Sequence, residues 1–184
     1  MESLENQLLI AMPSLKDPYF HKTVTYICEH NADGAMGLVI NIPVRITLNE
    51  LLAQIDADKV EVDDLNQRVL AGGPVATDRG FVLHNSQSGW NSSLELGNDI
   101  MITTSKDILE ALGTDKSPEQ FIVTLGYAGW GSGQLEKELQ ENSWLTTPAD
   151  KEILFDTPIE LRWQKAAEKL GIDLGHLSSE VGHA

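Results

Sequence analysis

The chain has little cysteine, little positive charge and no long apolar run. Cys28 is its only cysteine, so no disulfide can form within the chain. The 13 Lys and Arg residues face 28 Asp and Glu residues, and the formal net charge of −15 argues against a protein that coats nucleic-acid phosphates. No apolar stretch approaches the roughly 20 residues that a membrane-spanning helix needs.

The first residues also lack the features of a secretory leader. Met1 to Glu5 include two acidic residues, whereas a secretory signal begins with positive charge followed by an apolar stretch. Because the single cysteine gives no sign of an oxidising compartment either, we expect a cytoplasmic protein that is not embedded in a membrane.

What is present is enough for a buried core. The 184 residues are 41% hydrophobic and 22% charged, and this length suits one domain covering residues 1–184. Predicted strands come in runs instead of alternating strictly with helices. The pattern therefore predicts an α+β fold whose mixed or antiparallel sheet curls toward a barrel. Strands are expected at 8–12, 23–28, 37–41, 67–71, 80–84, 90–96, 99–103, 120–125 and 152–155.

Four short helices are expected between these strands. Thr47 and Glu50 have the spacing of a capping box, which predicts a helix that ends near Ile55. Further helices are expected over 104–112, directly after the glycines at 129–133, and over 158–170.

The stretch with the most functional promise runs from Gly126 to Gln134 and contains four glycines. It is predicted to link a strand to a helix, and backbone N–H groups at a helix start can bind an anion. Its spacing matches neither the phosphate-binding loop nor the dinucleotide-binding pattern, and Glu136 and Glu138 would repel a phosphate. A structural turn and an anion site therefore both remain open.

A second set of candidates comes from strand ends. With regular alternation of side chains, Cys28 and His30 lie on one face of the strand and Glu29 lies on the other. A thiol–imidazole pair of Cys28 and His30 is therefore conceivable. The simpler interpretation is that Cys28 is a buried core residue. The five histidines show no metal-binding spacing, and we expect neither a metal nor a cofactor. His30 and His84 are the pair that a metal site assembled from distant segments would use.

Basic residues are isolated in this acidic chain. Arg79 follows the Gly72–Gly73 turn and could bind a carboxylate or phosphate, or pair with a surface Asp. Arg162, Lys165 and Lys169 share one face of the last predicted helix, but cations near a helix C-terminus are expected from the helix dipole alone. Direct nucleic-acid binding is therefore not expected.

The segment from Leu8 to Val44, LLIAMPSLKDPYFHKTVTYICEHNADGAMGLVINIPV, resembles the N-terminal signature of the AlgH/YqgE family of small bacterial proteins. Later segments match in order: GGPVATDRGFVLH, GYAGWGSGQLEKELQENSWL, and LFDTPIELRW with the terminal Gly182-His183-Ala184. The resemblance covers essentially the whole chain. It implies a single α+β domain, with a strongly coiled sheet resembling a partial barrel, flanked by about four short helices.

The resemblance brings no catalytic set, and the family name refers to a proposed role in regulating alginate synthesis. We therefore expect a non-catalytic cytoplasmic binding or regulatory protein, with indirect regulation of transcription included. The alternative is a hydrolase or transferase acting on an anionic substrate at the glycine stretch, with two or more of His30, Arg79, His84 and Glu136 converging within about 3 Å of one point in a pocket. The candidate surface for an unknown protein or small-molecule partner comprises Glu29, His30, Asn41, Arg79, His84, Gly129, Trp130, Gly131, Gln134 and Glu136.

Overall fold

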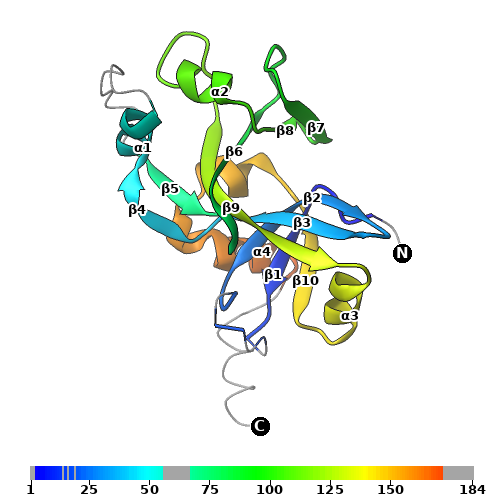
Figure 1. Cartoon of the computed structure of the whole chain (residues 1–184). Coiled ribbons are helices and arrows are strands. Elements are labelled where there is room, and N and C mark those ends of the chain that lie inside the picture. Colours follow the sequence, from blue (N-terminus) through cyan, green and yellow to red (C-terminus); the bar gives the residue numbers. More distant parts are fainter. Residues whose placement is uncertain (1–2, 14, 16, 19, 56–66, 172–184) are drawn as a thin grey trace.

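The computed structural model describes residues 3–171, apart from 14, 16, 19 and 56–66. These residues form the expected α+β fold, in which one curled, mainly antiparallel sheet makes a half-barrel (Figure 1). The strands of this sheet are β1 (Gln7–Ala11), β2 (Val24–Asn31), β3 (Gly34–Val39), β4 (Pro43–Thr47), β5 (Arg68–Ala71), β6 (Val75–Asn85), β7 (Ser93–Gly97), β8 (Ile100–Thr103), β9 (Phe121–Gly131) and β10 (Trp144–Pro148).

Short helices flank the sheet at the four places that the sequence indicates. At the start of the first helix the expected pairing of Thr47 with Glu50 is present, because the Glu50 N–H donates to Thr47 Oγ1 at 3.2 Å and the Thr47 hydroxyl donates to the Glu50 carboxylate at 3.3 Å. No helix of the described residues is long and apolar enough to cross a bilayer. The helical segments are α1 (Leu48–Ile55), α2 (Lys106–Ala111), α3 (Gln134–Gln140), the π-helix η2 (Glu152–Asp156), the 3₁₀-helix η3 (Ile159–Leu161) and α4 (Arg162–Lys169).

The long strand β9 joins the two halves of the sheet. Neighbouring strands follow the order β10-β1-β2-β3-β9-β6-β8-β7. Along one edge of β9, residues 128–131 pair with β3 and residues 124–125 pair in parallel with β5, while the opposite edge pairs with β6. Figure 1 shows α1 and α2 near one end of β9 and α3 near the other.

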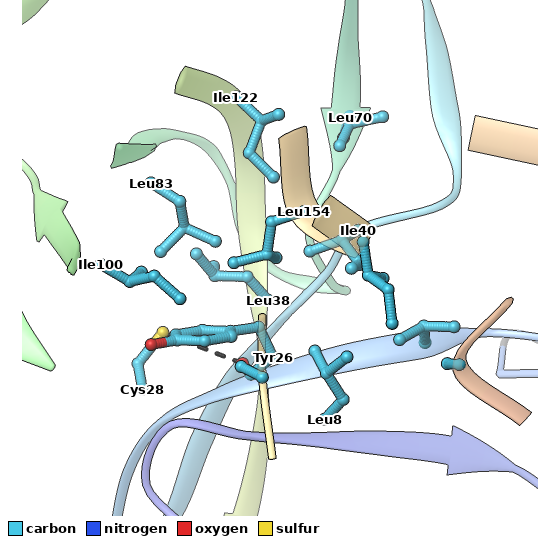
Figure 2. Packing of buried hydrophobic residues seen from close by; sticks show 14 of the residues in the cluster. Leu8, Tyr26, Cys28, Leu38, Ile40, Leu70, Leu83, Ile100, Ile122 and Leu154 are labelled. Atoms are coloured by element: carbon cyan, nitrogen blue, oxygen red, sulfur yellow. Dashed lines mark hydrogen bonds between the residues drawn. The ribbon is translucent and has the colours of Figure 1, made fainter. Parts of the chain in front are cut away.

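Alternating side chains divide the buried apolar residues into three clusters. Phe81 and Leu83 of β6 belong to the main cluster, whereas Val82 between them belongs to the cluster under α1 and α2. A third cluster lies against α3 and contains Trp130 and Trp144. Figure 2 shows the main cluster, in which strand side chains converge with Leu154 of η2.

Four segments differ from their predicted structure. The segment 152–155, predicted as a strand, belongs to the π-helix η2, because the Ile153 N–H donates to Asp150 Oδ1 at 2.8 Å and the Thr157 hydroxyl donates to the Glu152 carbonyl at 2.9 Å. The glycine stretch is strand β9 as far as Gly131, not a loop, since Ala128 and Trp130 are buried while the alternating Gly129 and Gly131 are exposed. The strands β4 and β10 were missing from the prediction.

Candidate functional site

The site is built on an irregularity in β6. Val75 pairs with Tyr127 of β9 and Gly80 pairs with Leu125, so that residues 76–79 of β6 lie opposite Gly126 alone. Such bulges bend a strand and redirect its side chains. Ala76 within the bulge has a φ of +47°, a conformation that residues with a Cβ rarely adopt. The bulge is fully exposed and ends with Arg79.

Close backbone contacts hold the start of this bulge on β9. Gly126 has a φ of +79°, and a Cβ added there would lie 2.5 Å from the Gly73 carbonyl oxygen. A Cβ on Gly72 would lie 2.4 Å from the Gly126 carbonyl oxygen. Only glycine fits such distances, which explains the glycines at positions 72 and 126.

Arg79 lines a cavity of about 550 Å³. This volume lies within the range of about 300–1,000 Å³ found for small-ligand sites, which are mostly apolar with a few placed polar groups. The lining combines six largely apolar side chains with two oppositely charged ones and three serine or threonine residues: Cys28, Met36, Phe81, Leu94, Ile102 and Tyr127, then Glu29 and Arg79, then Ser92, Ser93 and Thr104.

The Arg79 guanidinium lies over an aromatic ring. Its Cζ is 5.3 Å from the centroid of the Phe81 ring, a cation–π distance. Phe81 packs edge to face against Tyr127, with 6.0 Å between the ring centroids. Among the described residues no carboxylate lies within 4.0 Å of the Arg79 nitrogens. Its N–H donors are therefore available to an anion.

A bulge in β2 places Glu29 at the same cavity. The pairing with β3 shifts between Ile27 and Glu29, which breaks the alternation that the sequence pattern assumes. Cys28 and Glu29 consequently both line the cavity, while His30 lies against α3, so the expected sharing of one face by Cys28 and His30 is wrong. Burial raises the pKa of the Cys28 thiol well above its ordinary value, and Glu29 raises it further, so the thiol is protonated.

His30 connects two segments of the fold. The Leu4 N–H donates to its Nδ1 at 2.9 Å, so the proton of the neutral ring lies on Nε2, which hydrogen bonds to Glu136 Oε1. The side chain of His30 is 5% exposed, and the pair borders a separate cavity of about 450 Å³. Because both ring nitrogens are engaged, His30 attaches the N-terminal segment and α3 to β2.

His84 lies on the other face of β6 from the cavity. It is fully buried, its Nδ1–H donates to the Asn85 carbonyl at 2.7 Å, and its Nε2 accepts the Thr103 hydroxyl at 2.7 Å. Burial lowers its pKa, which keeps the ring neutral. Of the four residues named for the enzyme alternative, His30 and Glu136 therefore meet at one cavity, whereas Arg79 lines a different cavity and His84 lines neither.

The remaining sequence candidates have partners within the fold. Trp130 is 7% exposed, and its indole N–H and that of Trp144 both donate to Glu138 Oε1, at 3.2 and 2.9 Å. The Gln134 side chain accepts the N–H of Gly131 at 2.9 Å.

Asn41 links two segments, because its Oδ1 accepts the Val24 N–H and its Nδ2 donates to the Lys22 carbonyl, both at 2.9 Å. Gly129 and Gly131 belong to β9 and do not line the cavity.

Of the predicted candidates, only Glu29 and Arg79 meet at the cavity. The apolar lining, with Met36, Phe81 and Tyr127, was missed because each of these residues reads as core in the sequence. Among the described residues no three His, Cys, Asp or Glu side chains gather as metal ligands. His176 and His183, and the terminal Gly182-His183-Ala184, lie outside the described residues.

Comparison with known proteins gives one consistent family. The model of the family described as AlgH-like matches residues 8–175. A UPF0301 protein of Colwellia psychrerythraea is 66% identical over 210 residues, with 100% of both chains covered. A UPF0301 protein of Vibrio cholerae is 54% identical, with 99% of this chain and 100% of the relative covered.

Solved structures agree with this assignment. The solution structure of the AlgH protein from Pseudomonas aeruginosa has a TM-score of 0.81 and 49% identity, covering 99% of this chain and 96% of that one. A Corynebacterium diphtheriae protein has a TM-score of 0.76 at 18% identity, covering 97% and 92% of the two chains, which shows a shared fold. The chain thus belongs to the AlgH-like family, as its sequence segments indicate.

Proposed function

We propose that this protein is a non-catalytic cytoplasmic binding protein whose cavity takes a small molecule with an apolar body and an anionic group. The observation that best supports this proposal is the environment of Arg79. Its guanidinium lies over the Phe81 ring at a largely apolar cavity and has no carboxylate partner among the described residues. The anionic group would accept hydrogen bonds from the guanidinium, while the apolar body would cover Phe81 and Tyr127.

A regulatory role would follow from the position of the bulge. Residues 75–79 are exposed, so a ligand held by Arg79 would change the surface that this segment offers to a protein partner. Any effect on transcription would then be indirect, through that partner, because the net charge of −15 opposes direct contact with DNA.

Binding of 8-anilinonaphthalene-1-sulfonate tests this proposal, since the dye combines an aromatic body with one sulfonate. At pH 7 the native protein should raise the dye's fluorescence saturably. Arg79→Met should weaken the dye's affinity about tenfold, the amount expected for one charge-assisted contact at a partly exposed site.

Arg45→Met is the matched control, because Arg45 is also exposed but lies on β4 and does not line the cavity. This variant should bind the dye as the unmodified protein does. Equal affinity of the Arg79→Met variant and the unmodified protein would contradict the proposal, and so would the absence of any saturable binding.

A further inference from the structure

A second hollow, whose charged lining is acidic, borders the cavity. A neighbouring hollow of about 260 Å³ shares Glu29 and Met36 with the cavity of about 550 Å³. Glu29 and Asp33 are its charged lining residues, and both are exposed. Taken together, the joined cavities therefore have Arg79 in the lining of one, Asp33 in the lining of the other, and Glu29 and the apolar Met36 in the lining of both.

These charges do not neutralise each other. Among the described residues, neither Glu29, Asp33 nor Arg79 has an ion-pair partner within 4.0 Å. Glu29 accepts one hydrogen bond, from the Asn31 side-chain amide at 3.3 Å. A ligand with a cationic group at the carboxylates and an anionic group at Arg79 would complement both kinds of charge at once.

The cavity wall also offers unpaired main chain. Ser92, Ser93 and Leu94 line the cavity in succession, and among the strands of the described residues β7 pairs with β8 only, which leaves its other edge open there. An extended peptide can add to such an edge through main-chain hydrogen bonds, with its side chains in neighbouring pockets. Leu94, 57% exposed, gives this edge an apolar surface.

We propose that the joined cavities bind a short apolar peptide with both termini free, its ammonium group at Glu29 and Asp33 and its terminal carboxylate at Arg79. This inference rests on the proposed function, because the carboxylate uses the same anion site. It adds that the ligand is zwitterionic and that its cationic end is recognised by the two carboxylates.

Calorimetric titration with the tripeptide Leu-Phe-Leu, its N-acetylated form and its C-terminal amide tests the inference. The free peptide should bind, and blocking either terminus should weaken binding about tenfold. Glu29→Gln should weaken binding of the free peptide and reduce the effect of acetylation, because Asp33 remains, whereas Arg79→Met should abolish the effect of amidation. Glu95→Gln is the control, because Glu95 is an exposed carboxylate of β7 that does not line the cavity. This variant should show the same effects of acetylation and amidation as the unmodified protein.

The outcomes separate the two proposals. If the sulfonate dye binds through Arg79 but the tripeptide does not, or if acetylation leaves its affinity unchanged, the inference is wrong and the anion site stands. If neither probe binds, both proposals fail. Dye affinity of the Glu29→Gln variant should match that of the unmodified protein or exceed it, which shows that the variant is folded.

Discussion

At the scale of single residues, His84 shows how a buried polar side chain is satisfied. Asn85 offers a carbonyl, which can only accept, so Nδ1 carries the proton and Nε2 accepts from Thr103. Thr103 in turn accepts the Ser93 hydroxyl, and the three side chains lie on the adjacent strands β6, β8 and β7. This hydrogen-bonded chain of His84, Thr103 and Ser93 depends on a neutral imidazole, because a proton on Nε2 would face the proton of the Thr103 hydroxyl.

The neutral, buried His84 predicts that the free energy of unfolding depends on pH. Burial lowers the pKa of His84 below its ordinary value of 6.5, so below pH 6.5 the unfolded chain binds a proton that the native protein does not. The contribution of His84 to the free energy of unfolding is therefore complete above pH 6.5 and declines as the pH falls toward the lowered pKa. Urea unfolding at pH 7.5 and 5.5 should show a larger loss for the unmodified protein than for His84→Gln.

Glutamine is the informative replacement, because its amide can donate to Asn85 and accept from Thr103 without titrating. Other groups that titrate in this range contribute equally to both proteins. Identical losses of stability between the two pH values would refute the assignment of a neutral, buried imidazole.

At the scale of elements, the contact between the bulge of β6 and strand β9 depends on one glycine. Gly126→Ala combines a φ of +79° with a Cβ placed 2.5 Å from the Gly73 carbonyl oxygen. We expect a loss of about 2–4 kcal/mol in the free energy of unfolding, from left-handed strain and overpacking together. Chemical denaturation measures this loss.

Gly129→Ala is the control on the same strand. Its φ is not positive, and its added Cβ would lie 3.7 Å from Tyr127 Cε2, an ordinary contact. We expect a change of less than about 1 kcal/mol. A Gly126→Ala protein as stable as the Gly129→Ala protein would show that the close contact between Gly126 and Gly73 is absent in solution.

Element positions could be predicted where a local signal agrees with the tertiary structure. The pairing of Thr47 with Glu50 is an example, because its hydrogen bonds form within one turn. The end of β9 was misread because the glycines of Gly126–Gly131 suggest a turn, whereas the alternation of Ala128 and Trp130 marks the strand. The segment 152–155 was misread because η2 is fixed by Asp150 and Thr157, outside the apolar run.

At the scale of the whole molecule, a half-barrel brings distant segments to one cavity. The candidates Glu29 and Arg79 could be named from the sequence because a charged residue beside a turn stands out. That these two residues meet at one cavity could not be predicted from the sequence, because it requires bulges in two strands that shift the alternation of side chains. His30 and Glu136 meet across 106 positions of sequence for a similar reason, and their role is to attach segments.

The most direct test of the account is to find which residues the sulfonate dye touches. In a titration followed by ¹H–¹⁵N NMR, the largest amide shifts should occur at Met36, Phe81, Ile102 and Tyr127, which line the cavity. Amides of α3 and of His30 should stay nearly unchanged. Shifts centred on α3, or spread evenly over the protein, would contradict the assignment of the Arg79 cavity as the binding site.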